Sequence, residues 1–350
     1  MSVASEITRL YNVRSDIFDA IEAQGVDVPV TAVLDDCPDL IGQISGGTPT
    51  PTPVTGLPAN TIRCKFTSGY VPTIGTSRTQ VSSEPNVWDI YNSSSNWSNL
   101  FNYNTNLIDV LGGNLINVTQ VSNMFTSCYS LRNVFMENMD NITTSDYLFS
   151  YCTQMDVVIL DGLGANLTNT TYMFGYCYRL TSVPLFDTSH VTNANGMFGY
   201  CYSLSSIPQY NTSSVTNMNY MFNSCYSLTA IPNLNTSNVS QFSYTFSRCP
   251  ITTITNLDTS NATNLNGIFN NCTALTSIPL LNTSKVTNIG YAFQNCYNVQ
   301  SGALALYQQV SSQSTPPTNH SRTFEYCGSN TTTGAAELAQ IPSSWGGTGS

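Results

Sequence analysis

The sequence predicts an α/β repeat solenoid, built of turns of about 24 residues, with a small helical module before the repeats. Three observations predict this fold: cysteines recur every 23–25 residues, a phenylalanine lies three residues before each of them, and similar apolar and turn residues fill the space between them. A single repeat of this length cannot bury its own apolar face. The turns must therefore stack on one another and share one continuous core.

The Phe-x-x-Cys pairs of the repeat are expected to line this core, because phenylalanine and cysteine are among the residues most often buried. A degenerate copy, Phe101 with Asn104, precedes the array, and a further copy, Phe324 with Cys327, follows it. The pairs in register are Phe125 with Cys128, Phe149 with Cys152, Phe174 with Cys177, Phe198 with Cys201, Phe222 with Cys225, Phe246 with Cys249, Phe269 with Cys272 and Phe293 with Cys296.

The cysteines could bind zinc, form disulfides or pack the core. Zinc sites need close ligand pairs such as C-x-x-C, which the chain lacks, and it has only two histidines. Stacked turns would bring neighbouring cysteines to about 5 Å, which a disulfide tolerates, but side chains in such a ladder point in parallel. We therefore expect buried structural thiols, with no metal and no cofactor. Cys37 and Cys64 lie outside the column, and no role is predicted for them.

Between the pairs, each repeat predicts a strand, a turn and a helical segment. An apolar step such as Leu204–Ile207 favours a short strand, which the next proline ends because it has no N–H for the ladder. Asx-Thr-Ser sequences such as residues 211–213 favour a turn, although they could also form a polar recognition face. The i, i+3, i+4 spacing of Met218, Met221 and Phe222 predicts a short helical turn.

The complete pattern, M-F-x-x-C-x-x-L-x-x-I-P-x-x-[DN]-T-S-x-V-T-N-M, resembles the BspA-like leucine-rich repeats of bacterial and phage surface proteins. The best matches are residues 197–218 and 221–242, and the resemblance covers residues 97–300, with a weaker extension to 328. The resemblance implies a leucine-rich-repeat fold and a role in adhesion or surface recognition. It implies binding without identifying the ligand.

The chain outside the repeats begins with a predicted helical module at residues 1–44. Its apolar residues follow a heptad-like spacing, with Val3, Ile7, Leu10, Ile17 and Ile21 on one side. The module either packs on itself or serves in oligomerisation or docking, and a homotrimer would suit a fibre. The other predicted parts are a Pro/Thr/Gly linker at 45–56, a β-rich N-terminal cap at 57–96, the repeats at 97–300 and a C-terminal cap at 301–350.

Composition argues against several classes of function. The net charge is −10, most of it in residues 1–47, so the repeats offer no basic surface for nucleic acid. The sequence has no apolar run of about 18 residues that would predict a membrane span. The first twenty residues lack the basic and apolar regions of a secretory signal, so we expect synthesis in a cytoplasm. Without a recurring carboxylate pair, histidine cluster or phosphate-binding loop, we expect no enzymatic activity.

Tyrosines on both sides of the cysteine column form the candidate ligand-binding stripe. Residues that flank a buried cysteine point elsewhere, and tyrosine combines an apolar face with a polar tip that suits sugars and proteins. The alternative is that the rings stack on one another and only cover the core. The residues of the stripe are Tyr151, Tyr176, Tyr178, Tyr200, Tyr202 and Tyr226.

These features predict a non-enzymatic structural protein that presents a repeat surface. The first hypothesis is a phage virion protein (tail fibre, receptor-binding or capsid-decorating) that assembles in the host cytoplasm and binds a host-surface glycan or protein. Its N-terminal module would contact other virion proteins. The alternatives are a bacterial cell-surface adhesin of the BspA-like repeat family and a structural spacer without a ligand.

Overall fold

The computed structural model describes residues 51–349. The chain divides into two units, Met1–Val54 and Thr55–Ser350, and the division falls inside the predicted linker at 45–56. All elements that follow belong to the unit Thr55–Ser350. The predicted helical module lies outside the described residues, together with Val3, Ile7, Leu10, Ile17, Ile21 and Cys37.

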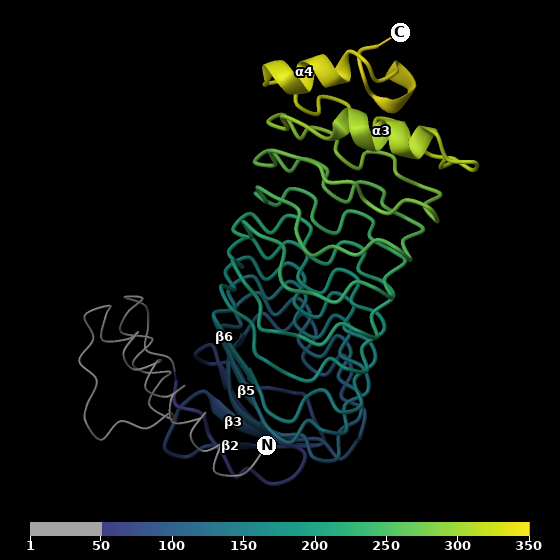
Figure 1. The fold of residues 1–350 in the computed structure, drawn as a ribbon. Coiled ribbons are helices and arrows are strands. Elements are labelled where there is room, and N and C mark those ends of the chain that lie inside the picture. Colours follow the sequence, from purple (N-terminus) through teal and green to yellow (C-terminus); the bar gives the residue numbers. More distant parts are fainter. Residues whose placement is uncertain (1–50, 350) are drawn as a thin grey trace, which may run out of the picture. The chain divides into compact units, whose positions relative to one another are not determined.

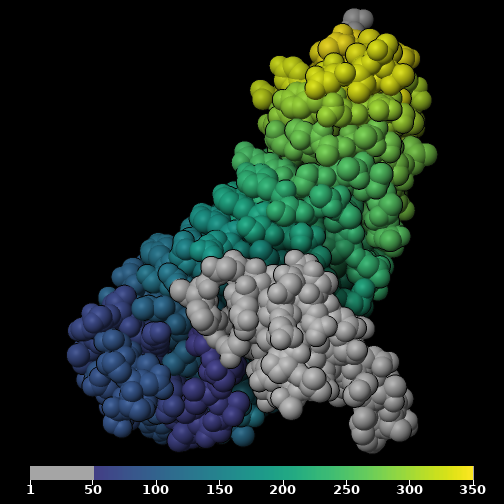
Figure 2. All heavy atoms as spheres, turned by 90° about the vertical axis from the view of Figure 1, so that its left-hand side faces the viewer, coloured from purple at the N-terminus to yellow at the C-terminus, as the bar shows by residue number. Residues whose placement is uncertain are grey.

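The unit Thr55–Ser350 is a stack of turns that begins at a sheet and ends at two helices (Figure 1). Each turn repeats the hydrogen bonds of the previous one: Phe198 N–H donates to the Met221 carbonyl at 3.0 Å, and Phe222 N–H donates to the Thr245 carbonyl at 2.9 Å. Parallel bridges link equivalent positions from residue 96 to residue 319. In Figure 2 the colours of this unit follow one another along the stack in the order of the sequence. This is the arrangement expected of a repeat protein in which each turn contacts only its neighbours.

A six-stranded sheet joins the N-terminal cap to the first turns, in the order β2-β3-β1-β4-β5-β6. The pairs β2–β3, β3–β1 and β1–β4 are antiparallel, whereas β4–β5 and β5–β6 are parallel pairs between successive turns. The cap therefore pairs with the outer edge of the first parallel strand. The strands are β1 (Thr61–Phe66), β2 (Ser77–Gln80), β3 (Val87–Tyr91), β4 (Leu107–Asn114), β5 (Asn133–Met136) and β6 (Val157–Leu160).

The strand predicted at Leu204–Ile207 is wrong. Strands form only in the early turns of the described chain, where β5 and β6 carry Phe135 and Ile159 at the place occupied later by Pro184 and Pro208. A proline there has no N–H to donate to the neighbouring turn. The residue that we expected to end the strand therefore prevents the parallel ladder from continuing past β6.

The helical segments predicted within the turns, such as 218–222, are also wrong. Met221 N–H bonds back to the Met218 carbonyl, but Tyr220 N–H donates to the next turn, at the Ser243 carbonyl. Tyr220 has a φ of 57°, in the left-handed region, and a right-handed helix cannot pass through it. The fold is a repeat stack of turns and strands, and the helices of its described part lie in the C-terminal cap: α3 (Ala303–Ser311), α4 (Thr332–Leu338) and the 3-10 helix η2 (Ser343–Trp345).

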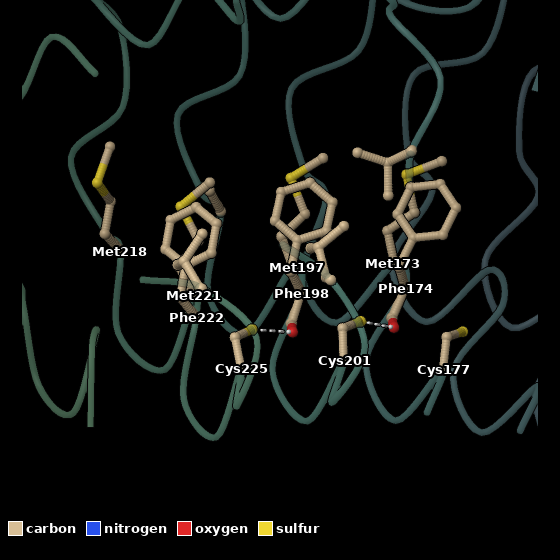
Figure 3. Packing of buried hydrophobic residues seen from close by; sticks show 14 of the residues in the cluster. Met173, Phe174, Cys177, Met197, Phe198, Cys201, Met218, Met221, Phe222 and Cys225 are labelled. Carbon is tan, nitrogen blue, oxygen red and sulfur yellow. Dashed lines mark hydrogen bonds between the residues drawn. The ribbon is translucent and has the colours of Figure 1, made fainter. Parts of the chain in front are cut away.

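The phenylalanines and cysteines of the repeat form two columns along the core. Every paired Phe and Cys from 125 to 296 is buried, as are Phe101, Phe324 and Cys327. Successive phenylalanine rings lie 5.2–6.1 Å apart between centroids and within 25° of parallel. Figure 3 shows the rings of Phe174, Phe198 and Phe222 in a row, beside the cysteine column.

Each column thiol also donates a hydrogen bond to the turn before it, a role that the sequence analysis missed. The sulfur atoms of Cys128 to Cys296 lie 3.0–3.3 Å from the phenylalanine carbonyls of the preceding turns. The Phe198 carbonyl, for example, accepts both Cys201 N–H and the Cys225 thiol. All cysteines in residues 51–349 are free, and Cys64 is buried in the same core from β1.

We expect the column thiols to resist alkylation in the folded protein. Burial raises the pKa of Cys201 to about 12, so roughly one such thiol in 10⁴ is ionised at pH 8. Iodoacetamide at pH 8 should leave a folded Cys37→Ala variant unlabelled and should label every cysteine after unfolding in urea, as measured by mass spectrometry. Rapid labelling of any column cysteine in the folded chain would contradict the buried ladder.

Candidate functional site

The six predicted tyrosines lie together as two adjoining columns, here called the tyrosine face. Neighbouring centroids are 4.1 and 4.5 Å apart in the first column and 4.6 and 4.9 Å apart in the second. The rings of Tyr200 and Tyr202, 6.5 Å apart, connect the columns. The first column is Tyr151, Tyr176 and Tyr200, each just before a cysteine, and the second is Tyr178, Tyr202 and Tyr226, each just after one.

The backbone of the repeat directs these rings away from the core. Tyr151, Tyr176 and Tyr200 have φ values of 63–65°, in the left-handed region, and the buried cysteine follows directly. The rings stack, as one of the two hypotheses expects, but they are not removed from solvent. Tyr151 remains 37% exposed and Tyr226 49% exposed, and the other four are partly exposed. The tyrosine face is therefore both a cover over the core and an accessible aromatic surface.

A third set of tyrosines, five residues before the cysteines, was missed by the sequence analysis. Tyr172 connects it to the tyrosine face, with its ring 6.2 Å from that of Tyr176. Gly196 takes the next place in this column because the Tyr172 ring lies over it, and an added Cβ would approach ring atoms to 2.4–2.7 Å. The recurrence itself is visible in the sequence, at Tyr147, Tyr172, Tyr220, Tyr244 and Tyr291.

Three phenols of the tyrosine face, and that of Tyr172 beside it, are held in the neutral form. Burial, with the neighbouring phenols, raises the pKa of Tyr172 to about 12 and also raises the pKa of Tyr176, Tyr178 and Tyr202. A protonated phenol can donate as well as accept a hydrogen bond. The arrangement thus offers apolar rings and hydroxyl groups, a combination suited to binding rather than to proton transfer near pH 7.

The tyrosine face ends at a groove of about 380 Å³, lined by Tyr226, Arg248, Cys249, Pro250, Asn271 and Thr273. Pro250 and Thr273 occupy the places that tyrosines hold in the second column, and Arg248 and Asn271 occupy those of the first. Smaller or more slender side chains thus open a depression beside Tyr226. This turn is also one residue shorter than its neighbours, with 23 residues from Phe246 to Phe269.

Charge in the groove comes from Arg248, which is exposed. Arg63, Arg179 and Arg322 pair with carboxylates, whereas Arg248 forms no salt bridge within residues 51–349. Its positive charge acts to lower the pKa of Tyr202, against the larger effect of burial, so the guanidinium lies near the tyrosine face.

The Asx-Thr-Ser sequences, in contrast, hold the turns together. Thr188 and Thr212 are buried, and their hydroxyls donate to carbonyls of the next turn at 2.8 and 3.0 Å. Asp187 accepts the Ser189 N–H, and these hydrogen bonds lower the pKa of the carboxyl group. These polar groups are used within the fold, which favours turn chemistry over a recognition face.

Residues 51–349 contain no group of three or more His, Cys, Asp or Glu placed to hold a metal ion. None of the helices in this part of the chain has the length and apolarity to cross a bilayer.

The repeats match a known protein family. Residues 95–206, 168–251 and 201–307 match a family described as "Mycoplasma protein of unknown function, DUF285". The crystal structure of a leucine rich cell surface protein from Faecalibacterium prausnitzii A2-165 is similar over 62% of this chain and 79% of that chain, with 20% identity and a TM-score of 0.32. A search of curated proteins gave no match. Because the three matched segments together span more than half of the chain, the protein belongs to the DUF285 family.

Proposed function

We propose that this protein is a non-enzymatic recognition protein of a bacterial cell surface, which binds a host-surface glycan or protein through its tyrosine face. The observation that carries the proposal is the union of six partly exposed tyrosines into two stacked columns on consecutive turns. The family description names a bacterial genus, and this favours the bacterial adhesin over the phage virion protein that the sequence analysis placed first.

The stacked rings suit binding because they are already ordered. A tyrosine that is held between two neighbours, as Tyr176 is between Tyr151 and Tyr200, loses little side-chain freedom when a ligand covers it. Tyrosine is also among the residues that contribute most to binding energy at interfaces. Repetition along the stack presents the same chemistry several times, which suits ligands that themselves repeat.

The double variant Tyr176→Asn/Tyr200→Asn is expected to bind its target at least about tenfold more weakly, since each lost ring removes a large contact area. Asparagine is chosen because it occupies the same place at Asn271 and Asn295, with φ values of 59° and 62°. Binding of the fluorescently labelled full chain to a glycan array and to cultured animal cells measures the effect.

The matched control is Tyr103→Asn. Tyr103 has the same place in the repeat and a φ of 58°, is 66% exposed and lies outside the stacked columns. It should bind like the unaltered protein. Equal binding by the double variant would argue against the tyrosine face. A folded protein that binds neither target would favour the structural spacer.

A further inference from the structure

The groove at the end of the tyrosine face combines an exposed aromatic ring, Tyr226, with a cation, Arg248. Tyr226 packs against Tyr202 with centroids 4.9 Å apart and the ring planes tilted by 32°. Toward the following turn it borders the groove, where Pro250 stands in place of a tyrosine. Tyr226 is accordingly 49% exposed. Such a ring can accept the apolar C–H face of a flat ligand.

Arg248 supplies a charge whose partner is missing from the described part of the chain. A guanidinium presents a planar set of N–H donors that matches a carboxylate, and it remains charged at every physiological pH. Thr273, on the same groove, offers a hydroxyl that can both donate and accept hydrogen bonds. Asn271 donates to Asn270 Oδ1 and accepts from Asn295 Nδ2, which leaves its amide one further N–H and one further lone pair for a ligand. The groove thus combines aromatic, cationic and neutral polar groups.

We propose that this groove binds an acidic sugar, a pyranose that carries a carboxylate, with its ring against Tyr226 and its carboxylate on Arg248. The inference deepens the proposed function and rests on it. The volume of about 380 Å³ falls at the lower end of the range of small-molecule sites, roughly 300–1,000 Å³, and suits one sugar unit. A single cation beside an aromatic ring and two hydroxyl-compatible side chains favours an acidic sugar over an acidic peptide, which would find no second cation in the groove.

The test compares methyl glucuronide with methyl glucoside, two sugars that share a ring and differ in the carboxylate. Isothermal titration of the full chain should show the glucuronide binding at least about tenfold more tightly. Arg248→Ala should abolish this preference, and Arg248→Lys should retain part of it. Tyr226→Thr, which copies the residue at Thr153 and Thr273, should weaken binding of both sugars.

The control is Arg179→Ala, because Arg179 already pairs with Asp156 at 3.1 Å. This replacement should leave the preference for glucuronide unchanged. Equal affinity for the two sugars, binding of neither, or a preference that survives Arg248→Ala would overturn the proposal. An oligoglutamate peptide that binds more tightly than the glucuronide and depends on Arg248 would also overturn it, in favour of an acidic peptide.

The results of this test and of the test of the proposed function can be told apart. If cell binding is lost with Tyr176→Asn/Tyr200→Asn but glucuronide is not preferred, only the assignment of the groove is wrong. If glucuronide is preferred through Arg248 but cell binding survives the tyrosine replacements, the tyrosine face is not the main surface that contacts the cell.

Discussion

Replacement of Phe222 by alanine is expected to lower the free energy of unfolding by about 3–5 kcal/mol. The ring is fully buried and stacks on Phe198 and Phe246, with centroids 5.6 Å away on each side. Alanine would leave a cavity that these two rings cannot fill, since each is held in place by the backbone of its own turn. Urea unfolding followed by circular dichroism measures the change.

The control for this variant is Leu185→Ala, because Leu185 is 68% exposed and its loss should change the free energy of unfolding by less than about 0.5 kcal/mol. We also expect Phe222→Ala to broaden the transition, since each turn contacts only its neighbours and the stack can separate at the weakened turn. A loss of unfolding free energy no larger than that of the control would show that the phenylalanine column does not stabilise the core.

Between pH 9 and 12 the folded protein is expected to lose stability steeply. Burial raises the pKa of Cys128, Cys201, Cys249 and Cys296 to about 12, above the value near 9 that a thiol has in the unfolded chain. The thiols therefore stay neutral in the folded state, while unfolding lets them ionise. Their contribution is fully present below pH 9 and is lost as the pH rises toward 12.

Each such thiol lowers the free energy of unfolding by about 1.4 kcal/mol for every pH unit of increase within this range. Four of them together lower it by about 5–6 kcal/mol per pH unit. Tyr172, whose pKa burial raises to about 12, adds to the slope above pH 10. Urea unfolding at pH 7, 8.5, 9.5 and 10 measures the profile. The Cys201→Ala variant should reduce this slope by about 1.4 kcal/mol per pH unit, which corresponds to one proton. A flat profile from pH 8.5 to 10 would be incompatible with buried thiols.

The tyrosine face could be recognised in the sequence only in part. A tyrosine beside a buried cysteine, such as Tyr176, is directed outward by local geometry, and its recurrence is visible in the repeat. The distance of 4.1 Å from Tyr151 to Tyr176 depends on how closely successive turns stack. The column that contains Tyr172 was overlooked because it lies farther from the cysteines, although it recurs with the same period.

The groove could not be predicted from the sequence. Tyr226, Arg248 and Thr273 are more than twenty residues apart from one another, and none of them marks a ligand by itself. They become neighbours because successive turns place equivalent positions next to each other. The depression then arises from a difference in size, since Pro250 and Thr273 leave the space that a tyrosine would fill.

The sequence by itself determined the period of the stack and the residues of its core columns, because these follow from hydrophobic residues that recur at one spacing. Only the tertiary structure decided the form of each turn. Proline at positions such as Pro208 removes a donor that a parallel strand needs, and a left-handed residue such as Tyr220 interrupts a helix. The backbone therefore satisfies its hydrogen bonds between turns, and it is the contact between turns that brings the tyrosines and the groove together.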